Sequence, residues 1–350
     1  MFTGKNPIKD LYVNHELLTS KSSDSDNYLT DFFLTRMLYN EPYAETTMEI
    51  SGLFQDKNMD AGELSSPYVT TRRRIAETFT KDNVKYYRYE LCVGINVGLA
   101  KQEIPLPANV SIQICFNRAA AAKGLLQITE KDSNNKALTY DERTVPIISP
   151  TLSVYFVESA NADTFYSKAR LYDISIPFYD YNIRRELLLD NISEHRVKLF
   201  EGPLPHSVVI GLMSPEVFDG DITKSSFKFT NHNLKSMDLQ VDNQSLPGYP
   251  LVMKNTNGIN FYLNYLKVTN RYENVYASGA INYSNFMNYN FLTFVNFRDE
   301  NLTNGQAILK LNFTANLTKK LYLVYMPLYE RQVVFDSFFN ASVDTVTERQ

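Results

Sequence analysis

The chain has 350 residues and a formal net charge of −4 at pH 7. It is therefore long enough to bury the core of one large domain or two medium ones, and too acidic to bind nucleic acid over a broad face without regard to sequence. Its two cysteines, Cys92 and Cys115, exclude a disulfide scaffold. No stretch approaches the roughly 20 apolar residues that cross a bilayer, and the first residues lack the apolar core of a signal peptide.

The high aromatic content, with 24 Tyr and 22 Phe, favours strands and turns over long helices. The first predicted element is nevertheless a helix over residues 28–39, because Leu29, Phe32 and Phe33 recur at helical spacing. Residues 40–83 show no clear period. We expect them to form a long excursion that contains a short helix near its three consecutive arginines.

From residue 84 the pattern changes to strands. Residues 84–97 resemble one long strand, and residues 110–116 alternate apolar and polar side chains, which is the period of a half-buried strand. Residues 152–156 and 172–178 repeat the alternation, and the last of these strands is expected to end near Pro177.

A change of rhythm separates the two halves of the chain. Residues 179–204 carry many charges, and Pro203 and Pro205 mark their end, so we place a domain boundary there. The second half then begins with a continuous apolar run, Ser207–Met213, as expected for a strand covered on both faces. Residues 226–229 and 237–241 alternate again, and the sequence DNQS directly after the second of them predicts a turn.

The remaining elements of the second half are one helix and three strands. Ile259, Tyr262, Leu263 and Leu266 share one helix face, with Thr256 or Asn257 as the cap. Strands follow at 291–297, 307–313 and 321–326, and Asn304-Gly305 is the expected hairpin turn before the second of them. Strands that recur in two halves imply two β-sandwiches, but periodicity does not select a jelly roll over another sandwich.

Motifs of catalysis and of metal binding are missing from the sequence. It contains no GxxxxGK[ST], GxSxG, HExxH or CxxC. The four histidines lie far apart without ligand spacing, so we expect structural or exposed roles for them and predict neither a cofactor nor a metal. Asp219-Gly220-Asp221 is more typical of a polar turn than of a calcium loop, which needs further oxygen ligands at fixed offsets.

Residues 201–251 resemble the hexon-type double jelly-roll major capsid proteins of Polinton/Maverick elements and adintoviruses, and their relatives in invertebrate genomes. That family has a G-x-L-P segment, an apolar strand, an F-x-G, a strand that carries phenylalanine, a strand that ends V-D-G-Q, and a P-x-x-P-L turn. Asn243 replaces the glycine, which a turn tolerates because Asn adopts the left-handed conformation. The family-motif positions, all with structural roles, are Gly202, Leu204, Pro205, Gly211, Phe218, Gly220, Phe227, Phe229, Asn231, Val241, Asp242, Gln244, Pro247 and Pro250.

The resemblance implies an all-β fold of two jelly-roll sandwiches with a few short inserted helices. Family members carry more sequence before the segment that matches residues 10–40, so we expect the first jelly roll to lack its N-terminal part. The expected division is a first jelly roll at 1–180 with an insertion at about 28–83, an inter-domain linker at 181–205, a second jelly roll at 206–340 and a tail at 341–350.

The function that the resemblance implies is structural and not enzymatic. Three chains would form a pseudo-hexameric capsomer in the capsid of a DNA virus or virus-like transposon, assembled in the nucleus or cytoplasm of the host cell. Its partners would be copies of itself, neighbouring capsomers and a penton or minor capsid protein, with no sequence-specific contact to nucleic acid. Segments 40–83 and 254–290 are candidate trimer contacts, because aromatic residues are enriched at interfaces; the alternative is that they pack the chain's own core. A lectin-like or receptor-binding sandwich is the alternative function.

Overall fold

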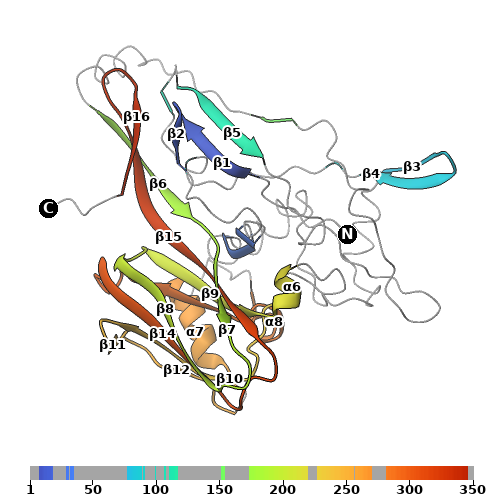
Figure 1. Cartoon of the computed structure of the whole chain (residues 1–350), viewed down its shortest axis with the longest axis vertical. Helices are drawn as coiled ribbons and strands as arrows, with labels where there is room; N and C mark the ends of the chain where they lie inside the picture. The colour runs from blue at the N-terminus through green and yellow to red at the C-terminus, as the bar shows by residue number, and fades with distance from the viewer. Residues whose placement is uncertain are drawn as a thin grey trace.

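A computed structural model gives the fold (Figure 1). The residues that it describes are 8–18, 29–30, 32–34, 77–88, 90, 99, 106–107, 110–116, 151–153, 173–219, 227–255, 257–269 and 281–345.

Strands dominate the described residues. In the first half these are β1 (Ile8–Val13), β2 (Glu16–Leu17), β3 (Glu77–Lys81), β4 (Val84–Arg88), β5 (Ile112–Phe116) and β6 (Ile174–Tyr181). In the second half they are β7 (Arg184–Leu188), β8 (Glu194–Pro203), β9 (Ser207–Met213), β10 (Leu234–Val241), β11 (Gln244–Ser245), β12 (Leu251–Val252), β13 (Leu292–Asn296), β14 (Asn304–Phe313), β15 (Leu321–Phe335) and β16 (Ala341–Thr345). The helices with complete bounds are α6 (Pro215–Asp219), α7 (Ile259–Val268) and α8 (Tyr283–Tyr289).

The second half of the chain forms two antiparallel sheets. One has the order β7-β15-β9-β13, and the other has the order β8-β14-β10, with the short strands β11 and β12 both paired to β10. The strands from β7 to β15 can be numbered 1 to 8 along the chain, if β11 and β12 together count as the fifth. In this numbering the first sheet has the order 1-8-3-6 and the second sheet has the order 2-7-4-5. This is the strand order of an eight-stranded jelly roll.

The core of this jelly roll lies between the two sheets. All seven residues of β9 are buried, as their continuous apolar run predicts. Buried residues of β10, β13, β14 and the first part of β15 belong to the same cluster, and so do Phe261 and Tyr265 of α7. Helix α7 packs on β13 and β12 and covers part of the sandwich (Figure 1).

Strand β15 extends through both halves of the molecule. Its residues 321–328 pair with β9 or β7 and contribute to the large core, whereas residues 328–335 pair with β6. Val333 and Phe335 belong to a second core with Ile176, Phe178 and Val13, next to the sheet β2-β1-β5. At about 3.3 Å per residue its fifteen residues are about 50 Å long. The C-terminal residues thus return to the first half of the chain (Figure 1).

The structure confirms several predicted elements of the second half. Strands at Ser207–Met213, 237–241, 307–313 and 321–326 are present, and α7 occupies residues 259–268. The turn after β10 is a two-residue hairpin loop, in which Asp242 and Asn243 have φ of 49° and 65°. Positive φ at both central residues is what a type I′ turn requires, and Asp and Asn accept it.

Other details of the second half were predicted wrongly. Asn304 and Gly305 are not a hairpin turn: they open β14 and pair with Pro203 and Gly202 of β8. Of the predicted strand 226–229, residues 227–229 are described; they form no strand and make one isolated bridge, from Phe229 to Asn290. Tertiary pairing decides the first segment, because a backbone group that finds a ladder partner overrides a turn preference. In the second segment, Phe227 and Phe229 are buried without a ladder.

The α7 prediction was right in part for the face and wrong for the cap. Tyr262 and Leu266 pack against the large core, but Ile259 is 48% exposed. The fully buried residues are Phe261, whose ring packs beside Phe291, and Tyr265, whose ring packs beside Phe294 and Phe286. The N-cap is Gly258, although the Oδ1 of Asn257 accepts a hydrogen bond from the Ile259 amide. Thr256 lies outside the described residues.

In the first half, Thr30 and residues 32–34 are helical, and the rest of the predicted helix 28–39 is outside the described residues except Leu29. Strands β4 and β5 lie within two predicted strands, and β6 continues past Pro177 to Tyr181. Residues 151–153 form no strand, and residues 154–156 are not described.

The division into two jelly rolls at the stated bounds remains a prediction. Residues 181–205, however, are not a connecting loop. They contain all of β7 and β8, and Leu188, Leu199 and Phe200 are buried in the large core.

Candidate functional site

The family-motif residues lie at three separate places, each with a packing role. The first is the connection from β8 to β9. Gly202 has φ of 89°, a conformation that favours glycine. Leu204 and Pro205 are buried, and the Leu204 amide donates to the carbonyl of Thr303 at 2.9 Å.

The second place is the hairpin after β10. The Asp242 Oδ1 accepts from the Gln306 amide at 2.9 Å, so the loop is fixed to β14. Val241 is buried and pairs with Gln244. Pro247 and Pro250 are exposed in the turn that leads to β12.

The third place is an aromatic cluster beneath β9. Gly211 lies against Phe229, whose ring is 5.3 Å from Phe33 and 5.6 Å from Phe32 between centroids. Phe227 lies 5.4 Å from Phe32. The helical residues 32–34 thus pack against the second jelly roll.

Two further motif residues lie near these places. Phe218 of α6 is fully buried, 5.3 Å from Tyr322 and beneath the Arg185 guanidinium. The Asn231 Oδ1 accepts from the Asn233 amide at 3.0 Å and so stabilises the turn before β10. Gly220 is outside the described residues. These residues support the fold and form no common pocket.

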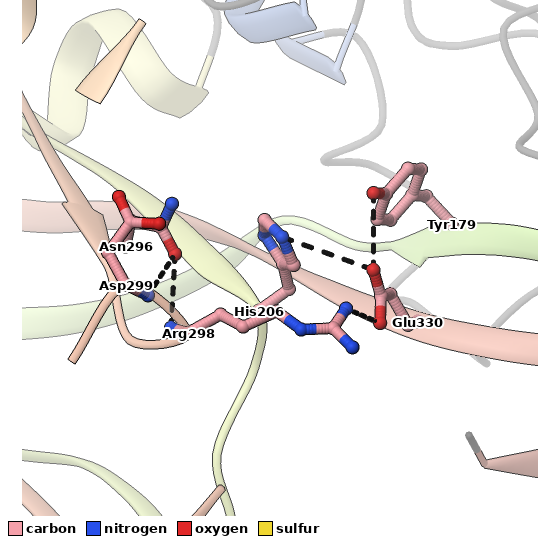
Figure 2. Close-up of polar contacts among 6 residues, drawn as sticks. All are labelled: Tyr179, His206, Asn296, Arg298, Asp299 and Glu330. Atoms are coloured by element: carbon pink, nitrogen blue, oxygen red, sulfur yellow. Dashed lines mark hydrogen bonds and ion pairs between the residues drawn. The ribbon is translucent and has the colours of Figure 1, made fainter. Parts of the chain in front are cut away.

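A polar cluster lies where β15 passes from one core to the other (Figure 2). The Tyr179 hydroxyl donates to Glu330 Oε1 at 3.3 Å, and Arg298 donates from Nη1 to Glu330 Oε2. His206 Nε2 is 4.0 Å from Glu330 Oε1, and its ring meets Tyr179 edge-on at 5.7 Å. These residues come from β6, β15, the β8–β9 connection and the turn after β13.

Backbone hydrogen bonds hold this cluster in place. The His206 amide donates to Leu328 at 2.8 Å, and its carbonyl accepts from Phe297 at 3.0 Å. The Asn296 Oδ1 accepts from the amides of Arg298 and Asp299 at 3.0 and 3.3 Å (Figure 2). The turn after β13 is thereby fixed against β15.

The electrostatics of the cluster suit a structural role. Burial has the largest effect on His206 and lowers its pKa below the usual value. The charges of Glu330 and Asp299 raise this pKa and the charge of Arg298 lowers it, but burial prevails. This histidine is therefore neutral at pH 7. Burial, and next the Glu330 charge, raise the pKa of Tyr179, which keeps its proton. A protonated phenol that donates to a carboxylate holds two strands together and supplies no nucleophile.

A second ion pair lies directly beside this cluster. Arg331 Nε is 3.2 Å from Asp180 Oδ2, and the Asp180 side chain is almost fully buried. In the ladder of β6 and β15, Tyr179 lies opposite Glu330 and Asp180 lies opposite Tyr329, so Asp180 and Arg331 form a diagonal ion pair next to the Tyr179–Glu330 rung. Neither contact could be predicted from local sequence patterns, because β6 and β15 are about 150 residues apart.

Within the described ranges, no group of three or more His, Cys, Asp and Glu side chains could hold a metal ion. In the same part of the chain, no helix is both long and apolar enough to cross a membrane. Of the two cysteines, Cys115 is a free, half-buried thiol, and Cys92 is not described.

Segments 40–83 and 254–290 are the two that we expected at trimer contacts, and the structure describes much more of the second than of the first. Phe261, Tyr265 and Phe286, in segment 254–290, pack the chain's own core. In segment 40–83 only residues 77–83 are described, as an exposed part of the hairpin of β3 and β4.

No family model matches the chain, and no curated protein matches its sequence. Among solved structures, a chain of the Sputnik virophage cryo-EM structure is similar with a TM-score of 0.58 and 11% identity, over 99% of this chain and 76% of that one. The fold is a double jelly roll.

Two further structures have TM-scores below 0.5 and add nothing to the fold assignment. PBCV-1 VP54, fitted into a reconstruction of Sputnik, has a TM-score of 0.48 at 10% identity, over 99% of this chain and 85% of that one. A chain of the PBCV-1 virus capsid model has a TM-score of 0.45 at 9% identity, with the same coverage.

Proposed function

We propose that the chain is a major capsid subunit of a DNA virus or virus-like transposon. The observation that carries the proposal is the complete jelly-roll strand order of residues 184–328, in a chain that is similar over 99% of its length to a chain of a virophage particle. A double jelly roll gives one polypeptide two sandwiches of similar kind. Three copies around a three-fold axis then present six sandwiches, which tile a surface as a pseudo-hexagon.

The site geometry fits a protein that works by shape. The polar cluster at Glu330 connects four segments, and the motif residues stabilise turns and core packing. We therefore propose a non-enzymatic role without a cofactor. The proposal includes membership among the Polinton/Maverick and adintovirus capsid proteins, which the resemblance of residues 201–251 supports.

The location and partners follow from the same proposal. The subunit would be part of the virion capsid, would assemble in the nucleus or cytoplasm of the host cell, and would contact copies of itself, neighbouring capsomers and a penton or minor capsid protein. Sequence-specific contact with nucleic acid is not part of it, and the net charge of −4 disfavours sequence-independent binding over a broad face.

The test is the mass and shape of the purified chain. Light scattering coupled to size exclusion should give three times the chain mass of 40.3 kDa at micromolar concentration, and negative-stain images should show three-fold particles. A stable monomer across that concentration range would refute the proposal. A monomer that also binds an immobilised glycan would instead support the lectin-like alternative.

A further inference from the structure

The hairpin turn between β15 and β16 has a firmly held shape. The Asp336 carboxylate accepts from the amides of Phe338 and Asn340, and from the Asn340 side chain, each at 2.8 Å. The Phe339 amide donates back to the Asp336 carbonyl at 2.9 Å. From the neighbouring β1–β2 turn, Asn14 Nδ2 donates to the Phe339 carbonyl at 2.6 Å.

This turn holds an aromatic side chain out in solvent. Phe338 is 83% exposed, the highest exposure among the large apolar side chains in the described ranges. The adjacent Phe339 has φ of 62°, a left-handed conformation that is unusual for an aromatic residue and that persists only where the surroundings enforce it. A preorganised aromatic residue loses little entropy on binding, and such residues dominate the binding energy of interfaces.

An aliphatic patch lies on the other half of the molecule. Leu187, Leu189 and Ile192, at the end of β7 and in the turn that follows, are 46%, 49% and 41% exposed. Leu187 and Leu189 are two residues apart along an extended chain and so project from the same side. Two backbone hydrogen bonds fix the turn. The Asn191 amide donates to the Leu317 carbonyl at 2.8 Å, and the Leu317 amide donates to the Ile192 carbonyl at 3.1 Å.

The two features lie toward opposite ends of the long axis of the molecule. The β15–β16 turn is at the top of Figure 1, and the end of β7 is in the lower part. A contact between unlike surfaces of two copies is head-to-tail, and when its rotation closes it generates a ring. In a ring of two-domain subunits, the first half of each copy must contact the second half of the next.

From these positions we infer that Phe338 of one copy packs on Leu187, Leu189 and Ile192 of the next copy. This inference rests on the proposed function, because it assigns the contact by which the subunits assemble. Both partners are apolar and both are held by backbone hydrogen bonds, so the contact buries apolar surface without having to order a loop first.

The experiment compares the assembly of the wild-type chain, Phe338→Ser, and Leu187→Ser/Leu189→Ser by sedimentation at a series of concentrations. Each variant should weaken assembly by about tenfold or more. Phe79→Ser is the matched control, since Phe79 is also exposed, at 42%, on a hairpin but has no part in the proposed contact. Circular dichroism and melting temperature establish that each variant folds.

Mixing the two variants tests the pairing itself. Each lacks a different side of the contact, so a mixture can form one intact contact between unlike copies but cannot close a ring. At a concentration where each variant alone is mainly monomeric, we expect the mixture to form a 1:1 dimer. Failure to associate on mixing would overturn the pairing.

Hydroxyl-radical footprinting of the wild-type chain gives a readout that needs no variant. Oxidation of Phe338 should slow severalfold when the protein is concentrated into its assembled form, and unchanged oxidation would overturn the inference. Assembly with full strength in Phe338→Ser would overturn the inference and leave the capsid proposal standing. A wild-type chain that never assembles would overturn both.

Discussion

Substitution of Gly211 by alanine should destabilise the second jelly roll through one defined overlap. A Cβ at this position would lie 2.5 Å from Phe229 Cδ1 and 2.8 Å from Leu292 Cδ2. Carbon atoms pack best about 3.5–4.0 Å apart, so the neighbours would have to move by about 1 Å. The Phe229 ring cannot retreat freely, because Phe32 and Phe33 lie behind it at 5.6 and 5.3 Å.

The expected cost of Gly211→Ala is about 1–3 kcal/mol of unfolding free energy, the usual range for overpacking a core. Phe229→Ala alone should cost about 3–5 kcal/mol, because it leaves a cavity. The double variant should be only slightly less stable than Phe229→Ala, since the added methyl group then enters the space that the ring vacates and only the overlap with Leu292 Cδ2 remains. The coupling energy between the two sites should therefore be most of the cost of Gly211→Ala, about 1–2 kcal/mol.

Urea denaturation followed by circular dichroism, at one fixed protein concentration, measures these differences. Gly202→Ala is the matched control, because Gly202 has nothing within 4 Å of its Cβ position and its cost would come from its φ of 89° alone. That cost should not change when Phe229 is removed. Additive effects of Gly211→Ala and Phe229→Ala would refute the steric argument.

Three more predictions concern the turn after β10, the buried histidines and the ion pair of Glu330. Because Asn243 has φ of 65°, Asn243→Gly should leave the urea midpoint nearly unchanged, whereas Asn243→Val should lower stability by about 1–2 kcal/mol; equal effects would contradict the type I′ assignment. Burial lowers the folded-state pKa of His195, His206 and His232, so the unfolded chain binds more protons than the folded chain near pH 6.5. The free energy of unfolding should therefore fall as the pH drops from 7.5 toward 5.5. A urea midpoint that does not change over this pH range would contradict the prediction. Glu330→Gln should lower the free energy of unfolding by about 0.5–1 kcal/mol, a small loss because the partner Arg298 is 47% exposed. The difference from wild type should shrink in about 1 M salt, where the screening length is about 3 Å. A loss of stability that salt does not change would exclude an electrostatic origin.

Local patterns in the sequence were sufficient to predict several elements of the second half, among them β9, β10 and α7. The continuous apolar run of β9 indicates a strand that is covered on both faces. The alternation of Met237, Leu239 and Val241 with polar residues indicates a strand that is covered on one face. The turn at Asp242 and Asn243 was also predictable, because few residues accept positive φ.

Predictions failed where a distant partner decides the conformation. Asn304 and Gly305 have the composition of a turn but extend β14, since β8 supplies ladder partners that no local pattern shows. Ile259 was placed on the buried face of α7, but the sheet beneath that helix receives Phe261 and Tyr265 instead. Helix α8, capped by the Asn282 side chain, was not predicted because its seven residues carry too few apolar positions to show a period.

The sequence by itself determined the class of the fold and the conformation of most segments in the second half, because side-chain period and turn chemistry act within a few residues. Only the tertiary structure decided the order of the strands, the passage of β15 through both cores, and the meeting of Tyr179, His206, Arg298 and Glu330. These features depend on contacts between residues as much as 150 or more positions apart, and the free energy of such contacts comes from shared burial that no local pattern records.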